Sequence, residues 1–208
     1  MNVFVSPSRD EHGKFKGIVQ AFPNIWKGTV LDVGCRSGNL KQALPNGNAG
    51  YIGFDLVPPA NILGNLETGL PFEPKSFDTV VALDSLEHTD RIHQTFTELC
   101  RVAKNYVLIA LPNAYELRAR LKFLMGQRLS GKYGLPVNPP SDRHRWFFSF
   151  QEAQTFTNEI GKQLGFHIEA EGCFVGPRRG TAGIREFVSV FPNLLSPSYA
   201  AVLRRERS

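Results

Sequence analysis

Short runs of β-branched and apolar residues alternate along this chain with longer segments that have helical periodicity. Seven such runs predict strands at residues 29–33, 51–56, 61–63, 77–83, 106–111, 166–175 and 199–204. Between them, apolar residues recur at spacings of three and four, as at Ile92, Phe96 and Leu99, which is typical of a helix with one buried face. The alternation predicts an α/β fold, a mostly parallel sheet with helices on both faces.

The segment after the fifth predicted strand breaks this regularity. Asn113 and Glu116 have the spacing of a helix cap, and apolar residues then line one face of a short helix. Residues 126–148 are rich in Gly, Pro and basic residues without periodicity, which indicates a long functional loop. We therefore expect one domain over residues 1–208, with residues 113–148 as a substrate lid or insertion.

Composition sets limits on the class of protein. The hydrophobic fraction of 42% and the charged fraction of 21% are ordinary for a globular chain. No apolar run approaches the roughly 18 residues that span a bilayer, and the N-terminus lacks the apolar core of a secretion signal. Cys35, Cys100 and Cys173 are odd in number and form no CxxC pair, so we expect neither a disulfide framework nor a metal site. A cytoplasmic protein is predicted.

The net charge of +5 is unevenly distributed. Seven basic residues and a single acid, Asp142, lie between Arg118 and Arg145, so that stretch carries six net positive charges. A local basic patch attracts anionic partners such as phosphorylated metabolites, nucleic acid or a lipid surface. A solvated face that aids solubility is the alternative interpretation.

The first predicted strand leads into a glycine turn, VLDVGCRSGNL, at residues 30–40. Gly34 permits a sharp turn, and Gly38 lets the following helix pack closely, so that free N–H groups can hold a carboxylate or phosphate. Asp55 follows Gly34 by 21 residues and ends the next strand. A carboxylate there can accept hydrogen bonds from ribose hydroxyls.

Other nucleotide-binding turns do not fit this stretch. Arg36 and Asn39 stand where a GxGxxG pattern requires glycine, which disfavours a nicotinamide enzyme, and the GxxxxGK[ST] signature of a P-loop is missing. Asp32 lies two residues before the first glycine, where it could engage the amino-acid part of a ligand without phosphate.

Three stretches resemble the ordered motifs of class I S-adenosylmethionine-dependent methyltransferases. LDVGCRSGNL (31–40) resembles their first motif, YIGFDL (51–56) the second, and LPFEPKSFDTVVALDSLEHTD (70–90) the stretch through their fourth strand. The match covers residues 28–112. Within this family, the chain is similar to the broad subgroup that includes quinone-biosynthesis, sugar and other small-molecule methyltransferases. It implies S-adenosyl-L-methionine as cofactor and a Rossmann-like, doubly wound, mostly parallel sheet of seven strands, the last one antiparallel.

The resemblance also implies cofactor contacts. They are Asp32, Gly34, Cys35, Arg36, Gly38, Asp55, Leu56, Asn65, Leu66, Asp84 and Ser85. Asp32 would lie near the ammonium of the methionine part, while Asp55 would bind the ribose hydroxyls. Leu56 and residues 65–66 would contact the adenine, and Asp84 would face the methionine end or the transfer site.

A sulfonium methyl donor is already activated, so the protein must align a nucleophile and exclude water. An oxygen or nitrogen nucleophile also needs a base that works near neutral pH, and His88 and His144 are the candidates. His88 could instead start a helix or contact the cofactor, and His144 could bind an anion or cap a helix. Arg36, where the family most often has glycine, would cover the methionine carboxylate, point outward or weaken binding.

The predicted function is methyl transfer to an O, N or C nucleophile of a small metabolite, anionic in the favoured case, such as a sugar, lipid or quinone precursor. A methyltransferase-like binding protein that works through a partner is the alternative. The helix at residues 115–125 is expected to cover the active site, with peripheral membrane contact as its other possible role. A nucleic-acid partner is not expected: Asn138-Pro139-Pro140 precedes Ser141, not an aromatic residue, and follows the fifth strand instead of the fourth.

Overall fold

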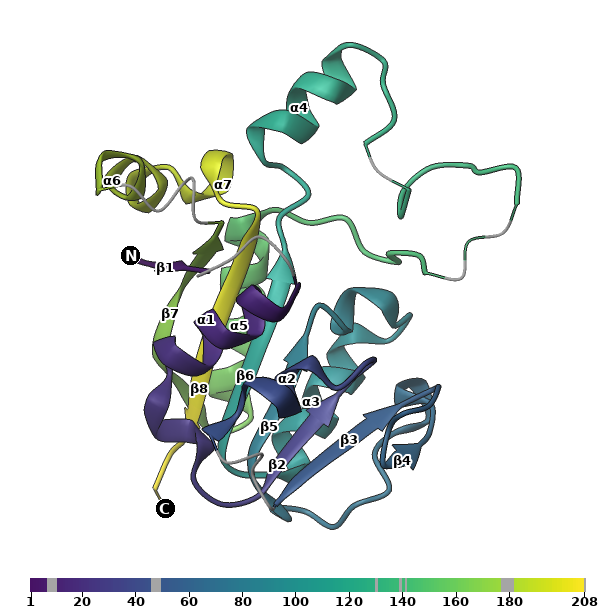
Figure 1. The fold of residues 1–208 in the computed structure, drawn as a ribbon, viewed down its shortest axis with the longest axis vertical. Coiled ribbons are helices and arrows are strands. Elements are labelled where there is room, and N and C mark those ends of the chain that lie inside the picture. The colour runs from purple at the N-terminus through teal and green to yellow at the C-terminus, as the bar shows by residue number, and fades with distance from the viewer. Residues whose placement is uncertain are drawn as a thin grey trace.

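The computed structural model describes residues 1–6, 11–45, 50–129, 131–138, 140, 142–176 and 182–207. Pro139 and Ser141, two residues of the proline-rich stretch noted above, lie outside the described residues. One sheet of eight strands runs through the molecule in the order β1-β7-β8-β6-β5-β2-β3-β4 (Figure 1). The strands are β1 (Asn2–Val5), β2 (Val30–Val33), β3 (Tyr51–Asp55), β4 (Ile62–Leu63), β5 (Phe77–Leu83), β6 (Ala103–Pro112), β7 (Phe166–Val175) and β8 (Ser198–Arg205).

Helices cover both faces of this sheet (Figure 1). They are α1 (Glu11–Ala21), α2 (Asn39–Ala43), α3 (Ile92–Val102), α4 (Leu117–Leu124), α5 (Phe150–Gln163), α6 (Ala182–Val190) and α7 (Pro192–Leu195), with short 3-10 turns η1 (Pro23–Trp26), η3 (Leu66–Thr68) and η4 (Leu86–His88). Phe96 of α3 and Phe150 of α5 are buried in the core on one face, while Ile18 of α1 and Leu40 of α2 are buried in the core on the other. The predicted α/β architecture is confirmed.

The strand directions follow the expected pattern. β2 pairs in parallel with β3 and with β5, and β5 pairs in parallel with β6. The last strand, β8, is antiparallel to both β6 and β7, as predicted. The carboxyl ends of β2, β3 and β5 therefore meet at one edge of the sheet, where an open α/β sheet binds its ligands.

The eighth strand, β1, was not predicted. It is a four-residue edge strand that pairs in parallel with β7, and only Val3 of it is fully buried. Because this strand is short and half-exposed, its apolar and polar residues show little alternation. The sequence pattern therefore did not reveal it. Helix α1 was missed as well, although Phe15, Ile18 and Phe22 have the spacing of a helix face and pack into the core.

The cap predicted for α4 is wrong. The helix begins at Leu117 without a side-chain cap. Asn113 is instead buried, and its side-chain oxygen accepts hydrogen bonds from the amides of Tyr115 and Phe150. Its amide nitrogen donates to the carbonyls of Asn193 and Ser196. Asn113 thus joins the end of β6 to the start of α5 and to the C-terminal segment, a long-range role that local spacing cannot reveal.

Helix α4 projects away from the sheet (Figure 1). None of its residues is buried, and Leu124 is 79% exposed. The apolar face of α4, which was predicted to cover the active site, is therefore exposed to solvent at the end of the helix. The loop after α4 leads the chain back to the sheet, whereas the helix itself does not pack on it. Among the described residues, no helix is long and apolar enough to cross a membrane.

Candidate active site

The glycine turn between β2 and α2 is built around the close approach of Gly34 to Ser85. Gly34 has φ +76°, and its amide donates to the carbonyl of Phe54 at 2.8 Å. A Cβ at this position would lie 2.3 Å from the Ser85 hydroxyl oxygen. That hydroxyl lies 3.0 Å from the carbonyl of Val33 and 3.1 Å from that of Leu83, so it can donate to only one of them at a time. Glycine alone fits here, because a side chain would force β2 and β5 apart.

The second half of the turn is closed by Gly38, whose amide donates to the Cys35 carbonyl at 2.8 Å. Gly38 has φ +70° and directly precedes α2. Cys35 is buried against Gly53, where an added Cβ would lie 2.7 Å from the sulfur. Burial, helped by the nearby Asp32, raises the pKa of the Cys35 thiol to about 11. The thiol is therefore neutral and packs beneath the turn.

Asp32 lies in the core below the turn, with 3% of its surface exposed. Its carboxylate accepts a 2.7 Å hydrogen bond from the Tyr51 hydroxyl. Burial raises the pKa of Asp32 to about 7, and the hydrogen bond from Tyr51 opposes that rise. The contact of Asp32 with a ligand ammonium stays a prediction, since the partner that the structure places on this carboxylate is Tyr51.

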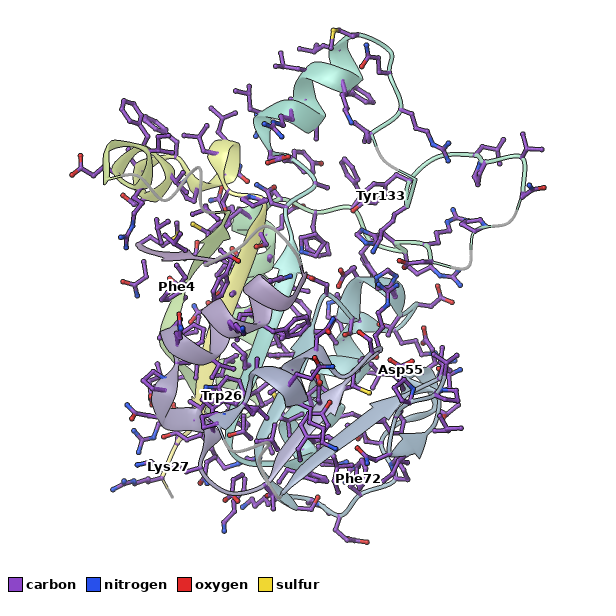
Figure 2. The ribbon with its side chains drawn as sticks, in the orientation of Figure 1. Phe4, Trp26, Lys27, Asp55, Phe72 and Tyr133 are labelled. Carbon is purple, nitrogen blue, oxygen red and sulfur yellow. The ribbon has the colours of Figure 1, made fainter. Side chains whose placement is uncertain are left out.

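Asp55, labelled in Figure 2, ends β3 with its carboxylate held by two backbone amides. One oxygen accepts from the amide of Arg36 at 2.8 Å, and the other from the amide of Val57 at 3.3 Å. A carboxylate offers about four acceptor sites, so lone pairs remain for two hydroxyl groups. Leu56, which follows, is 67% exposed and presents an apolar surface beside the carboxylate.

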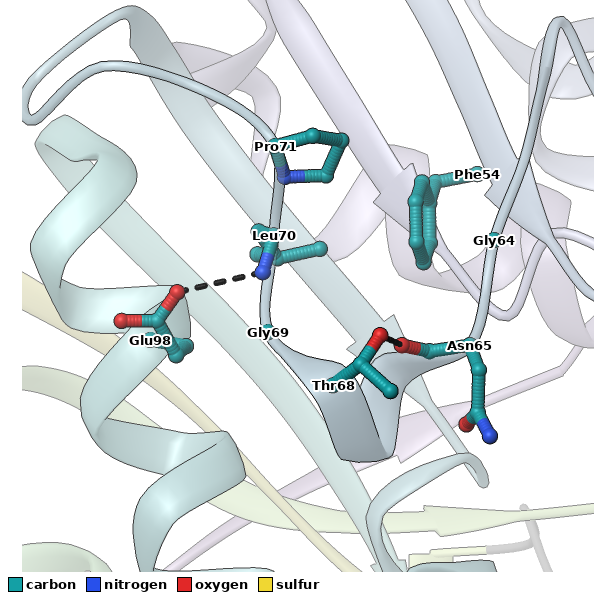
Figure 3. Close-up of a pocket in the computed structure, with 8 residues that line it drawn as sticks. All are labelled: Phe54, Gly64, Asn65, Thr68, Gly69, Leu70, Pro71 and Glu98. Carbon is teal, nitrogen blue, oxygen red and sulfur yellow. Dashed lines mark hydrogen bonds between the residues drawn. The ribbon is translucent and has the colours of Figure 1, made fainter.

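Asn65 and Leu66 lie at the start of η3. The side-chain oxygen of Asn65 accepts a hydrogen bond from the Glu67 amide at 3.0 Å. The backbone carbonyl of Asn65 accepts one from the Thr68 hydroxyl at 2.8 Å. A cavity of about 260 Å³ opens here (Figure 3). It is lined by Phe54, Gly64, Asn65, Thr68, Gly69, Leu70, Pro71 and Glu98. Of the predicted cofactor residues only Asn65 is in this lining, so the cavity lies beside the predicted site.

Asp84 directly follows β5 and forms an ion pair with Lys14 of α1. It has φ +52°, an uncommon backbone conformation for a residue other than glycine, and its amide donates to the Ala110 carbonyl at 3.0 Å. Such strain is tolerated where the surrounding structure fixes it, and it is concentrated at functional sites. Lys14 was not predicted as a site residue. The helical spacing of apolar residues in α1 was the signal that would have placed it over the sheet.

The segment between α4 and α5, called the returning loop below, leads back to the sheet, and its residues 142–146 contact η4 and the residue that follows it. The Arg145 amide donates to the Glu87 carbonyl at 2.8 Å, and the Trp146 indole donates to the Thr89 carbonyl at 2.8 Å. On the other side of η4, His88 Nδ1 lies 3.0 Å from the carbonyl oxygen of Arg143. The loop is therefore fixed to the segment that directly follows Asp84 and Ser85.

Asp142 connects this loop to the glycine turn. Its carboxylate lies 2.8 Å from the Arg36 guanidinium, 3.0 Å from the Lys132 ammonium and 3.0 Å from His88 Nδ1. The Arg36 side chain, 62% exposed, therefore points toward the loop. Sequence reasoning gave Arg36 three possible roles, and the structure adds a fourth, an ion pair that joins the turn to the loop.

The two predicted catalytic histidines lie together, with ring centroids 4.7 Å apart. Burial lowers the pKa of His88, although its hydrogen bond to the Arg143 carbonyl opposes that shift. Burial, assisted by Lys132, lowers the pKa of His144 to about 4. Both imidazoles are therefore neutral at pH 7. Glu87, which sequence reasoning did not assign to the site, is completely buried between them, and burial raises the pKa of its carboxyl group.

Comparisons with known proteins agree with the fold. Residues 31–111 match the family model of the methyltransferase domain. No curated protein sequence matches the chain.

Solved structures with the same fold cover most of the chain. Magnesium protoporphyrin IX methyltransferase from Synechocystis PCC 6803, solved with bound S-adenosylhomocysteine, is 16% identical with a TM-score of 0.57, over 96% of this chain and 89% of that one. A methyltransferase partner of the Trm112 activator from Haloferax volcanii is 15% identical with a TM-score of 0.54, over 96% and 98%. The small RNA methyltransferase HEN1 is 19% identical with a TM-score of 0.58, over 92% of this chain but 25% of that one.

The matched domain spans β2 to β6 and contains the glycine turn, Asp55 and the Asp84–His88 segment. The fold, its single antiparallel last strand and the domain match agree with one another. Residues 31–111 of this chain form a methyltransferase domain with the class I, Rossmann-like fold, and the domain indicates S-adenosylmethionine as its cofactor.

Proposed function

We propose that this protein transfers the methyl group of S-adenosylmethionine to an O, N or C nucleophile of a small, anionic metabolite, and that residues 113–148 form its substrate lid. One observation carries the proposal. The returning loop is joined to the glycine turn by the Arg36–Asp142 ion pair, and it places His144, Arg143 and Arg145 beside the end of β5. We propose the cytoplasm as its location, from the sequence alone.

The described residues fit the cofactor. Asp55 keeps acceptor sites for the ribose hydroxyls, and the exposed Leu56 would lie along the adenine. Glycine at position 34 keeps the turn free of side chains where the methionine part would pass. When bound, the cofactor supplies a methyl group that is already activated by the sulfonium. The protein then contributes alignment of the acceptor and exclusion of water. With good geometry, alignment lowers the activation barrier by roughly 7–11 kcal/mol.

Removal of a proton from the acceptor falls to His88 in this proposal. Its pKa is lowered, so it is neutral at pH 7, and its ring has more access to solvent than His144, with 25% of the side chain exposed against 8%. With Nδ1 bound to the loop, the free acceptor is Nε2. His144, whose pKa of about 4 makes it a weak base, is better suited to hold the loop in place.

The basic loop supports an anionic acceptor. Arg143 and Arg145 flank His144, and the Arg145 ion pair to Asp90 is half-exposed, with 3.4 Å between the atoms. An anion arriving at the mouth would therefore meet two guanidinium groups at little cost in broken contacts. Sugar phosphates and carboxylated quinone or lipid precursors have the charge that this arrangement favours.

A methyltransferase-like binding protein with weak catalysis is the second candidate. The observation that favours it is the exposed apolar surface of α4, where Phe123 and Leu124 lie open to solvent. Arg118, Arg120 and Lys122 lie on the same helix, so a protein partner or an anionic membrane surface would suit it. One compared structure is a complex with an activator, which shows that such pairing occurs on this fold.

Two measurements test the proposal. A thermal melt with S-adenosylhomocysteine at about 100 times its dissociation constant should stabilise the protein by roughly 2.7 kcal/mol, or on the order of 5–11 °C. Transfer of a labelled methyl group should then be measured against a panel of sugar phosphates, hydroxylated lipids and quinone precursors. A melting shift without turnover on any acceptor would favour the binding protein. No shift at millimolar ligand would contradict both candidates.

A further inference from the structure

Three potential metal ligands meet where the loop packs on η4. Glu87 Oε1 lies 3.8 Å from His88 Nε2 and 3.8 Å from His144 Nε2. The ligand atoms of the three side chains all lie within 4.8 Å of one another. Two of these residues are neighbours in sequence, whereas the third comes from the loop, so the cluster exists only in the folded chain.

The inner atoms of this cluster lack partners. Both carboxylate oxygens of Glu87 and Nε2 of His144 are buried without any hydrogen bond. Leaving a buried polar atom unpaired destabilises the fold, and more so when the atom is charged. Native proteins rarely retain such atoms without a ligand, an ion or a catalytic role. Three such atoms in one cluster are acceptors that a bound cation would satisfy.

The Nδ1 atoms of His88 and His144, in contrast, each have a hydrogen-bond partner. His88 Nδ1 lies 3.0 Å from the Arg143 carbonyl oxygen and 3.0 Å from the Asp142 carboxylate, while His144 Nδ1 lies 2.8 Å from the Tyr133 hydroxyl. Carbonyl and carboxylate oxygens accept hydrogen bonds, so the proton of His88 resides on Nδ1 and leaves a lone pair on Nε2. Metal-binding histidines are fixed in this way, with the second nitrogen donating to a carboxylate, a carbonyl or a similar group.

We propose that Glu87, His88 and His144 bind one divalent transition-metal ion, of the Zn²⁺, Mn²⁺, Fe²⁺ or Co²⁺ type, in a site with two imidazoles and one carboxylate. Ligand atoms about 2.1 Å from a tetrahedral ion lie roughly 3.4 Å apart. The two distances from Glu87 Oε1, both 3.8 Å, need to shorten by a few tenths of an ångström, and the remaining pair of ligand atoms lies within 4.8 Å. Two nitrogen ligands favour these ions over Mg²⁺, which prefers oxygen.

Sequence analysis predicted no metal, because the spacing from His88 to His144 matches no metal-binding motif. Three protein ligands leave positions open for water or an acceptor oxygen, as in catalytic metal sites. On the proposed methyl transfer, which this role presupposes, the ion would orient an acceptor oxygen near η4. Metal binding would occupy Nε2 of His88, so the base role proposed for His88 would hold only for the metal-free protein.

Metal binding can be tested without any activity. Tag-free protein is first stripped with a chelator and then titrated with Zn²⁺ by calorimetry and with Co²⁺ by visible absorption. One equivalent should bind, and the Co²⁺ spectrum should show low-symmetry coordination by nitrogen and oxygen. Glu87→Gln and His144→Asn should each lower the affinity at least about 100-fold, and Tyr133→Phe, which removes an outer partner, by roughly 10-fold.

His167→Asn is the matched control, since His167 is an exposed histidine on β7. The Zn²⁺ affinity of this variant should equal that of the wild type. Circular dichroism and the metal-free melt confirm that each variant folds; Glu87→Gln should do so because it removes a buried, unpaired carboxylate. Equal affinity in the wild type and both ligand variants would overturn the proposal, as would no binding by the wild type. A normal melting shift with S-adenosylhomocysteine in that case would leave the proposed function intact.

Discussion

The glycine turn and the returning loop form the two sides of the same mouth, yet they are held by different forces. The turn is fixed by backbone hydrogen bonds from buried strands and by the contact of Gly34 with Ser85. The loop is attached by the backbone hydrogen bond from Arg145 to Glu87 and otherwise through side chains, chiefly the pairs of Asp142 with Arg36 and Lys132, whose cations are 62% and 37% exposed. Exposed ion pairs contribute about 0–1 kcal/mol each.

This difference separates two tasks. A site for the constant ligand, the cofactor, is built into the sheet and needs no movement to form. On the proposed function, the loop side admits and releases the acceptor, and its exposed ion pairs would let it open without unfolding a strand. Substitutions in the turn should therefore change stability and cofactor binding, whereas substitutions in the loop should change acceptor use and leave the sheet intact.

Gly34→Ala should have the largest effect. The new Cβ would clash with Ser85, and alanine would be strained at φ +76°. Strain and overpacking together should lower the free energy of unfolding by about 2–6 kcal/mol. Gly165→Ala is the control, because Gly165 has φ +75° and nothing lies within 4 Å of its added Cβ. Urea unfolding should show the larger loss for Gly34→Ala; equal losses would mean that the Ser85 contact has no importance.

Asp32→Asn should change how stability depends on pH. Below pH 4 this carboxyl is protonated in both states, whereas between pH 4 and about 7 only the unfolded chain ionises. The free energy of unfolding of the wild type should therefore fall as pH rises through that window, by on the order of 4 kcal/mol from this group, and then level off. The variant should lose that part of the slope in urea unfolding at pH 4, 6 and 8. Parallel curves would mean that Asp32 is ionised in the fold.

Asp55→Asn tests the cofactor side directly. Losing charge-assisted hydrogen bonds to the ribose should cost about 1.5–3 kcal/mol, or roughly 10- to 100-fold in the affinity for S-adenosylhomocysteine measured by calorimetry. Asp142→Asn is the matched carboxylate on the loop, and it should leave that affinity within about threefold. A loss of the same size in both variants would remove the proposed division between turn and loop.

Local patterns were enough to predict the turn side. β5 and β7 have the predicted bounds, and Asp55 and Gly34 lie where strand ends and glycines indicated. These features follow from residues close in sequence, since alternation, helical spacing and a positive φ are encoded over a few positions. The order of the strands followed from the resemblance to a family, and the strand count differed only by the edge strand β1.

The loop side could not be predicted in the same way. Lys14 meets Asp84, and Glu87 meets His144, across 70 and 57 positions of the chain. The contact of Glu87 with His144 depends on how an irregular segment packs on the folded sheet, and no periodic pattern records it. Lys14 lies on α1, whose helical spacing places it over the sheet but does not identify Asp84 as its partner. Even the apolar stripe of α4 was misleading, because its spacing predicted a covered face and the structure leaves it exposed.

Replacing Arg143 and Arg145 by glutamine should affect only the acceptor. Losing two partly exposed cations should raise the KM for an anionic acceptor by about three- to tenfold, with the affinity for S-adenosylhomocysteine unchanged. The effect should shrink as salt is raised, because screening weakens the same attraction. Lys162→Gln with Arg204→Gln, two surface cations on α5 and β8, is the control. A matching drop in cofactor affinity would assign the arginines to the turn instead of the acceptor.

Arg36 belongs to both regions, so its substitution should have the smallest effect and locate the boundary between them. Its backbone amide holds Asp55, which Arg36→Gln preserves, and its exposed side chain pairs with Asp142, which Arg36→Gln removes. Stability should change by less than about 1 kcal/mol, and the affinity for S-adenosylhomocysteine should stay within about threefold. Arg36→Gly is the companion variant, since it also relieves the positive φ of 45°. If glutamine weakens cofactor binding tenfold or more, the guanidinium contacts the cofactor and the turn side extends to that side chain.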